Sequence, residues 1–288
     1  MQNKAKFGPA GNSDSFTARG YKSFRDIPKY IREMNLDVFE YQCGRGVRIS
    51  EQNARELGEL AAQQQVGLSL HAPYYISLSG LEEQKRLNSA RYLLESAQAL
   101  RPMGGQRIVL HSGSAGKQSR EQALALAKQT LRYCLDRLDE AGFADLTFCP
   151  ETMGKVGQLG SLEEVMELCS IDERLIPCID FGHLNARTQG GAANKEQMAA
   201  ILDTMENRLG RARAQQFHAH FSKIAYTTGG EKCHLTFSDT QYGPEPEPLL
   251  ELIVERGLYP TIICESAGTQ AEDALYMKKV YEQLLNRS

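Results

Sequence analysis

The segment IPCIDFGHLNAR, residues 176–187, is apolar for several positions and then places Asp180 and His183 three residues apart. An apolar run of this length between helical stretches is typical of a buried strand in a parallel sheet. A carboxylate and an imidazole at the end of such a strand are costly to bury alone, so each needs a charge, a hydrogen bond or a metal ion. The segment therefore predicts a parallel α/β fold with a polar site at the end of this strand.

The same alternation extends over the whole chain. Apolar runs predict eight strands, at 6–11, 37–43, 67–73, 107–113, 145–151, 175–183, 216–222 and 261–266. Helical patterns separate them, at 24–34, 51–64, 82–102, 119–141, 161–169, 194–208, 246–256 and 270–286. Eight alternations without a Pro/Gly/Ser-rich linker predict one closed (β/α)8 TIM barrel, a single domain over residues 1–288, with a doubly wound open sheet as the alternative. The patternless stretch 222–245 is long for a loop in this fold, which predicts a functional or mobile segment.

Composition is that of an ordinary globular protein, because 41% hydrophobic residues provide enough apolar material for a full core. The formal net charge of −3 gives no overall attraction for nucleic acid, although a local basic groove is compatible with it. The seven cysteines lack CxxC spacing, and the N-terminus lacks the apolar stretch of a signal peptide. No run approaches the length of a membrane span. We therefore expect a cytoplasmic monomer with no membrane partner.

Metal-binding residue types gather where the predicted strands end. These residues are His71, His111, Glu151, Asp180, His183, His218 and Glu265. In an α/β barrel the carboxyl ends of the strands converge on one face, where active sites form. Carboxylates and imidazoles packed there repel or desolvate one another unless a cation compensates them. The pattern predicts a metal centre at this face, with zinc favoured by the mixed donors and manganese or iron as alternatives.

The number of these residues exceeds what one ion needs. One divalent ion is satisfied by the residues that end strands five to eight, namely Glu151, Asp180, His218 and Glu265. His71 and His111 are surplus to it and fit a second ion that shares Glu151 as a bridge. His183 and His234 indicate a third position. Clustered divalent ions are typical of phosphoester hydrolysis.

Five segments in order along the chain carry a specific resemblance. They are HAPYYISL (71–78), LHSGS (110–114), PETMGKVGQLGSLEE (150–164), CIDFGHLNA (178–186) and HAHFSK (218–223). They resemble the metal-binding motifs of the endonuclease IV family of apurinic/apyrimidinic endonucleases, within the xylose-isomerase-like barrel superfamily. The resemblance implies Zn²⁺ as cofactor and hydrolysis of DNA 5′ of abasic sites in DNA repair. It also implies that Glu151 and Glu265 hold and orient the attacking hydroxide.

The third ion site departs from the family pattern. The family's Asp-Arg-His triplet corresponds here to Lys232, Cys233 and His234, so a lysine replaces the aspartate. Glu231 is adjacent, but a shift of one position changes the direction in which a side chain leaves the backbone. We therefore expect two firmly bound Zn²⁺ ions and a third site that is only partly filled.

Residues outside the metal set are candidates for substrate binding. The resemblance places Tyr74 and Tyr75 in a loop that enters DNA at the abasic gap, where an aromatic ring stacks on a base. Arg45 is a candidate phosphate contact. Lys155 and Lys223 follow strand ends, where they hold an anionic substrate or neutralise the carboxylates.

A different chemistry in the same superfamily is the main alternative. A sugar or polyol isomerase or epimerase would use a single divalent ion, held by Glu151, Asp180, His218 and Glu265, on a small sugar substrate. His71, His111 and His183 favour the nuclease, because one ion has no use for them. A non-catalytic metal-binding or nucleic-acid-binding module is a third class.

Overall fold

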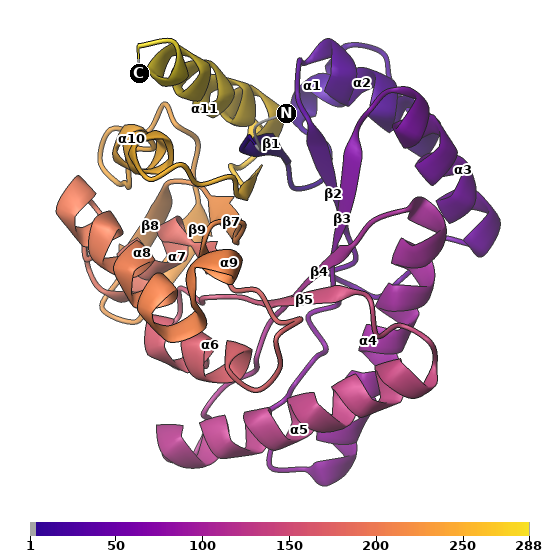
Figure 1. Cartoon of the computed structure of the whole chain (residues 1–288), viewed down its shortest axis with the longest axis vertical. Coiled ribbons are helices and arrows are strands. Elements are labelled where there is room, and N and C mark those ends of the chain that lie inside the picture. The colour runs from indigo at the N-terminus through magenta and orange to yellow at the C-terminus, as the bar shows by residue number, and fades with distance from the viewer. Residues whose placement is uncertain (1–3, 288) are drawn as a thin grey trace.

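The predicted barrel is confirmed by the structure, a computed structural model that describes residues 4–287 (Figure 1). Its parallel strands are β1 (Lys6–Pro9), β2 (Val38–Gln42), β3 (Gly67–His71), β4 (Arg107–Leu110), β5 (Thr147–Pro150), β6 (Cys178–Asp180), β7 (His218–Phe221) and β10 (Thr261–Cys264). They form two four-stranded halves, in the orders β2-β3-β4-β5 and β1-β10-β7-β6. Single bridges between Ala10 and Glu40 and between Glu151 and Cys178 join the halves into a closed ring.

Helices cover the outside of this ring, and Figure 1 shows the chain passing once around it from indigo to yellow. The longer helices are α2 (Ile27–Glu33), α3 (Glu51–Gln63), α4 (Glu83–Met103), α5 (Arg120–Glu140), α6 (Leu162–Cys169), α8 (Lys195–Leu209), α10 (Glu247–Glu255) and α11 (Gln270–Leu285). Each corresponds to a predicted helix. The predicted helix 24–34 begins with the 3-10 turn Phe24–Asp26 and continues as α2. Short helices that the sequence pattern did not predict are α1 (Asp14–Ala18), α7 (Phe181–Arg187) and α9 (Arg211–Ala214).

Local sequence sets the helix boundaries and the close approach of the strands. The side chain of Ser161 accepts a hydrogen bond from the backbone of Glu164, and Glu164 closes the capping box that starts α6. In β1, a Cβ atom on Gly8 would lie 1.8 Å from the carbonyl oxygen of Val38. Glycine at this position therefore allows β1 to approach β2 and lets the ring close.

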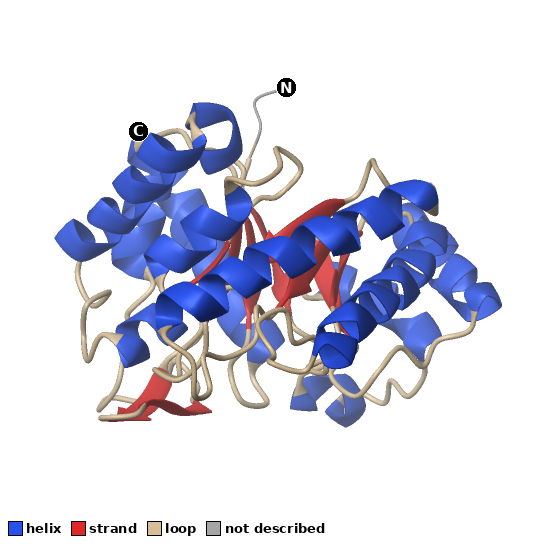
Figure 2. Ribbon diagram, turned by 90° about the horizontal axis from the view of Figure 1, so that it is seen from below, coloured by secondary structure: helices blue, strands red, loops and turns tan. Residues whose placement is uncertain are grey.

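The segment after β7 forms a hairpin, where the sequence showed no pattern. Strands β8 (Ile224–Thr227) and β9 (Gly230–His234) pair antiparallel. Figure 2 shows them extending beyond the ends of the barrel strands. Both strands are short and partly exposed, so they lack the apolar run that marks a barrel strand. No helix in the described part of the chain has the length and apolar character needed to cross a membrane.

Candidate metal centre

The carboxyl ends of the barrel strands enclose a cavity of about 390 Å³. It is lined by His71, Tyr74, His111, Glu151, Met153, Lys155, Gln158, His183, Glu231, His234 and Glu265. Alternate residues of a strand point to the same side, so the inward positions of neighbouring strands meet here. The structure thus brings most of the sequence-predicted metal ligands to one place.

Glu151 lies at the centre of the cluster, and each of its two carboxylate oxygens lies near a different pair of histidines. Its Oε2 lies 3.3 Å from Nε2 of His71 and 3.0 Å from Nε2 of His111. Its Oε1 lies 3.2 Å from Nδ1 of His220 and 3.3 Å from Nδ1 of His183. The carboxylate is therefore placed between two groups of imidazoles, as the bridge between two ions requires.

A second group of donors shares Glu151. Glu151, Asp180, His220 and Glu265 each offer one atom, and these atoms lie within 4.8 Å of one another. Oδ1 of Asp180 accepts a hydrogen bond of 2.7 Å from the backbone N–H of His183, at the start of α7. Oδ2 is fully buried and has no hydrogen-bond partner among the described residues. Oδ2 does lie 3.3 Å from Nδ1 of His183 as an ion pair. A buried carboxylate oxygen that accepts no hydrogen bond, within a set of nitrogen and oxygen donors, fits a divalent cation.

In the structure, His220 takes the place in this donor group that the sequence analysis gave to His218. Both side chains point into the barrel because they are two residues apart on β7. His220 pairs with Asp180 of β6, at the level of the cavity, whereas His218 pairs with Cys178, one layer deeper. The prediction placed His218 at the end of its strand, but His218 is the first residue of β7. The sequence alone does not tell which of the two inward imidazoles joins the donor group of Glu151, Asp180 and Glu265.

A third group contains His183, His234 and Glu265, whose donor atoms also lie within 4.8 Å of one another. Glu231 joins it, with Oε2 3.4 Å from Nε2 of His183 and Oε1 3.9 Å from Nε2 of His234. A bulge in the hairpin explains this position. Tyr226 pairs with Glu231, whereas the preceding residue of β8 pairs with Cys233, so Lys232 is an extra residue in β9.

From the sequence, we expected the shift of one position to turn the Glu231 side chain away from the third site, and the structure corrects this expectation. Glu231 and His234 are three residues apart, and a regular strand would place them on opposite faces. The extra residue Lys232 absorbs one position and returns both side chains to the same face. Lys232 itself is exposed to solvent.

Hydrogen bonds at the far ring nitrogens orient two of the imidazoles. Nδ1 of His71 lies 2.9 Å from the carbonyl oxygen of Ala72, and Nδ1 of His183 lies 2.9 Å from that of Thr152. Because a carbonyl only accepts, both Nδ1 atoms carry the proton in the neutral rings. Each Nε2 then offers its lone pair to the cavity, as a metal ligand must.

The electrostatics of the cluster depend on burial and on close opposite charges. Burial alone would raise the pKa of Glu151, but the imidazoles of His220 and His111 hold that pKa well below its usual range. Burial raises the pKa of Asp180. Burial alone would lower the pKa of His183, but Asp180 and Glu151 outweigh it and raise the pKa to about 10. Protons on the imidazoles thus offset the carboxylate charge, and a bound cation would displace them.

The predicted substrate-binding residues separate into two kinds. Tyr74 and Lys155 line the cavity, and the Tyr74 ring stacks on His111 at a centroid distance of 5.3 Å. Tyr75 is 54% exposed, packs against Tyr92 and is not part of the lining. Arg45 is likewise exposed and outside the lining.

Lys223 has a structural position instead. Its side chain is almost fully buried, and its amine donates hydrogen bonds to the carbonyl oxygen of Asp239 at 2.7 Å and to the carboxylate of Glu245 at 2.6 Å. It therefore ties down the segment that follows the hairpin, and it is not among the residues that line the cavity. This corrects its predicted role as a substrate contact.

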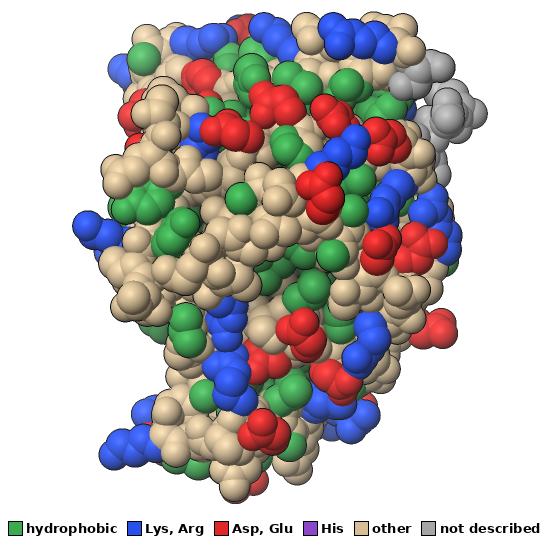
Figure 3. All heavy atoms as spheres, turned by 90° about the vertical axis from the view of Figure 1, so that its left-hand side faces the viewer, with side chains coloured by type: hydrophobic (Ala, Val, Ile, Leu, Met, Phe, Trp, Pro, Cys, Tyr) green, Lys and Arg blue, Asp and Glu red, His purple; other side chains and the backbone are tan. Residues whose placement is uncertain are grey.

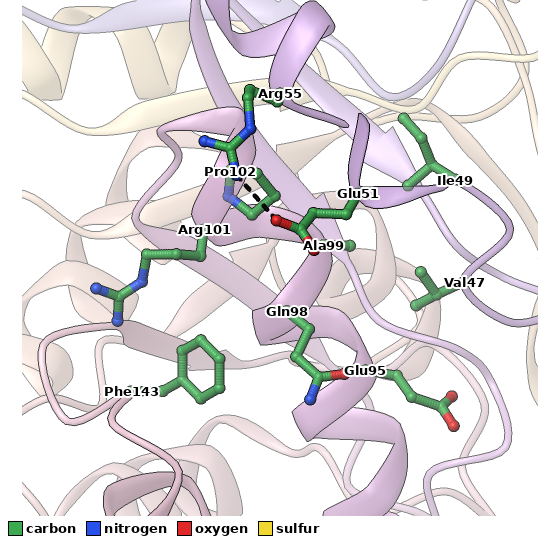
Figure 4. Close-up of a pocket in the computed structure, with 10 residues that line it drawn as sticks. All are labelled: Val47, Ile49, Glu51, Arg55, Glu95, Gln98, Ala99, Arg101, Pro102 and Phe143. Carbon is green, nitrogen blue, oxygen red and sulfur yellow. Dashed lines mark hydrogen bonds and ion pairs between the residues drawn. The ribbon is translucent and has the colours of Figure 1, made fainter. Parts of the chain in front are cut away.

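A larger hollow of about 580 Å³ lies on the outside of the barrel, where α3 approaches α4 (Figure 4). Its charged groups already have partners, because Arg55 pairs with Glu51 at 2.9 Å and Arg101 pairs with Asp145 at 2.6 Å. It contains no histidine. Figure 3 shows charges of both signs interspersed on another outer face of the molecule, with no single sign that would attract a charged ligand. The strand-end cavity is therefore the candidate site.

Comparison with known proteins identifies the family of the chain. The model of the family described as xylose isomerase-like TIM barrel matches residues 28–280. The chain belongs to this family. An uncharacterized protein of Methanocaldococcus jannaschii is 33% identical over 88% of this chain and 90% of its own length. A probable endonuclease 4 of Mycoplasma pneumoniae is 28% identical over 54% of each chain.

Solved structures share the fold at low sequence identity. A D-tagatose 3-epimerase-like protein superposes with a TM-score of 0.72 and 21% identity, over 98% of both chains. Endonuclease IV from Thermus thermophilus superposes with a TM-score of 0.66 and 18% identity, over 98% of this chain and 100% of its own. Together with the buried donor clusters, these comparisons describe a metal-dependent enzyme of the xylose isomerase-like TIM barrel superfamily.

Proposed function

We propose that this member of the family is a phosphodiesterase that hydrolyses DNA on the 5′ side of abasic sites. The observation that carries the proposal is the two-sided environment of Glu151, whose oxygens face different groups of imidazoles. A one-ion isomerase needs only the group that contains Asp180 and Glu265. The additional groups built on His71 and on His183 support a multi-ion centre, which suits phosphoester hydrolysis.

The residues of the site fit this chemistry. Divalent ions held by the three groups would lower the pKa of a bound water and neutralise charge on the phosphate and the leaving oxygen. The side chain of Glu265 is 16% exposed, so its carboxylate is able to orient a water that enters from the cavity. The exposed Lys155 amine at the cavity wall is placed to hold a phosphate of the substrate. Tyr74 offers an exposed ring on which a base can stack.

A cleavage assay on zinc-loaded protein tests the proposal. The substrate is an end-labelled duplex with one tetrahydrofuran abasic analogue, and the matched control is the same duplex with an intact nucleotide. We expect a single cut immediately 5′ of the analogue and none in the control. Loss of a group that only supports a metal ligand costs about 10–100-fold. Glu151→Gln, which neutralises a shared ligand, should therefore lower the rate more than ~100-fold, whereas Glu59→Gln on the exposed surface of α3 should not change it.

The epimerase alternative has its own support in the donor group Glu151, Asp180, His220 and Glu265, which suffices for one ion. The same preparation should therefore be incubated with D-tagatose and other ketohexoses, with products separated by chromatography, and its metal content measured. Two or three ions per chain with cleavage of abasic DNA support the nuclease. One ion per chain with sugar turnover and intact DNA would refute it.

A further inference from the structure

Glu40 is a buried carboxylate that lies beneath the metal centre and is not part of the cavity lining. It sits on β2, a strand that contributes no ligand to the clusters described above. Its Oε1 accepts a hydrogen bond of 3.0 Å from Nε2 of His220, and its Oε2 accepts one of 3.0 Å from Nε2 of His218. Ser69 donates a further bond of 2.9 Å to Oε2. Among the described residues, the ion-pair partners of Glu40 are these two histidines of β7.

This contact decides which nitrogen of His220 faces Glu151 and Glu265. A proton on Nε2 is required for the bond to Glu40, which leaves the lone pair of the neutral ring on Nδ1. That Nδ1 lies 3.2 Å from Oε1 of Glu151 and 3.5 Å from Oε1 of Glu265. His220 is therefore turned the opposite way to His71 and His183, which present Nε2 to the cavity.

We propose that Glu40 is a positioning residue that holds His220 in the orientation in which Nδ1 binds the ion of the Glu151, Asp180 and Glu265 group. A carboxylate behind a ligating imidazole fixes the tautomer and makes the ring a stronger donor. Oε2 is held separately by His218 and Ser69, so the carboxylate cannot rotate away from His220 without breaking both bonds. The sequence pattern does not indicate this role, because Glu40 precedes the end of its strand.

The inference does not depend on the reaction that the ions support. The donor group around Asp180 is needed by a nuclease and by an epimerase alike, so the test measures metal binding and not DNA cleavage. Failure of the cleavage assay would leave the role of Glu40 standing, and failure of the test below would leave the proposed nuclease standing.

The first test uses the unmodified protein. Protein labelled with ¹⁵N at histidine is loaded with ¹¹³Cd²⁺, and scalar couplings from cadmium to the ring nitrogens are recorded by NMR. We expect coupling to Nδ1 for His220, together with a protonated Nε2, and coupling to Nε2 for His71 and His111. Coupling of His220 through Nε2, or no coupling at all, would overturn the proposal. A merely structural Glu40 predicts no particular nitrogen.

The second test compares two substitutions around the same carboxylate. Glu40→Gln keeps the volume but loses the charge and one acceptor oxygen, so the side chain can no longer accept from both imidazoles. We expect the dissociation constant of one zinc ion to rise about 10–100-fold, while the ion at His71 and His111 is unchanged. Ser69→Ala removes a bond to Glu40 and leaves the bond to His220, so zinc binding should change less than ~3-fold. Equal zinc affinity in both variants would contradict the role assigned to Glu40. If Glu40→Gln does not fold, the cadmium experiment alone decides.

Discussion

Among individual residues, the sequence identified the kinds of ligand and the place where they gather. His71, His111 and Glu151 lie together as the strand endings predicted. The exchange of His218 for His220 could not be predicted, because both imidazoles point inward and their depth depends on the register with β6. Glu40 was missed for a similar reason, since its histidine partners are 178 and 180 residues away in sequence.

Glu231 leads to a prediction about the third ion. Glu231→Gln should weaken binding of the ion near His183 and His234 by ~10-fold or more, because the only carboxylate supplied by the hairpin loses its charge. Lys232→Gln is the matched control and should have no effect, since the Lys232 side chain is exposed. Lys232→Asp should also leave occupancy unchanged, because Glu231 already occupies that position. Zinc titration of the four proteins checks this, and increased third-site occupancy in Lys232→Asp would show that Glu231 is not a ligand.

Among the helices and strands, the long periodic helices were predictable and the short hairpin was not. A helix such as α5 repeats its apolar positions over many turns, whereas β8 and β9 are four and five residues long and half exposed. The bulge depends on pairing between the two strands, which a single-strand pattern does not contain. The hairpin in turn pairs with the loop after β5, because the N–H of Glu231 donates to the carbonyl of Gly154 at 3.1 Å. The β5 loop and the hairpin therefore hold the third group together.

Gly154 provides a test of this contact. A Cβ atom there would lie 2.6 Å from Cβ of Glu231 and 2.9 Å from Cδ2 of His183, so the hairpin must shift to accommodate it. We expect Gly154→Ala to weaken the third ion by at least ~10-fold, as expected for a displaced ligand, while the ion at His71 and His111 stays bound. Gly157→Ala in the same loop meets no atom within 4 Å and is the control. Zinc titration with unchanged third-site affinity in Gly154→Ala would mean that the hairpin does not position this ion.

For the barrel as a whole, eight alternations of strand and helix predicted the fold, because the pattern of each strand and helix lies within a short stretch of sequence. The contacts that close the ring are not local. Ala10 bridges to Glu40 where β1 meets β2, and Glu151 bridges to Cys178 where β5 meets β6. Closure also brings together carboxylates from four barrel strands or strand ends, namely Glu40, Glu151, Asp180 and Glu265. Their mutual repulsion is a property of the closed ring and of no single segment.

Removal of the ions should therefore destabilise the entire barrel. An ion that binds only the folded state at 100 times its dissociation constant stabilises it by about 2.7 kcal/mol. For a chain of this size, each kcal/mol changes the melting temperature by roughly 2–4 °C. We thus expect a chelator such as EDTA to lower the melting temperature by roughly 5–10 °C per tightly bound ion, measured by calorimetry.

Added Zn²⁺ should restore the melting temperature, whereas Mg²⁺ should not. Mg²⁺ prefers oxygen ligands, and the clusters supply nitrogen donors from His71, His111, His183, His220 and His234. Superimposable melting curves with and without chelator would contradict a barrel that is stabilised by bound ions.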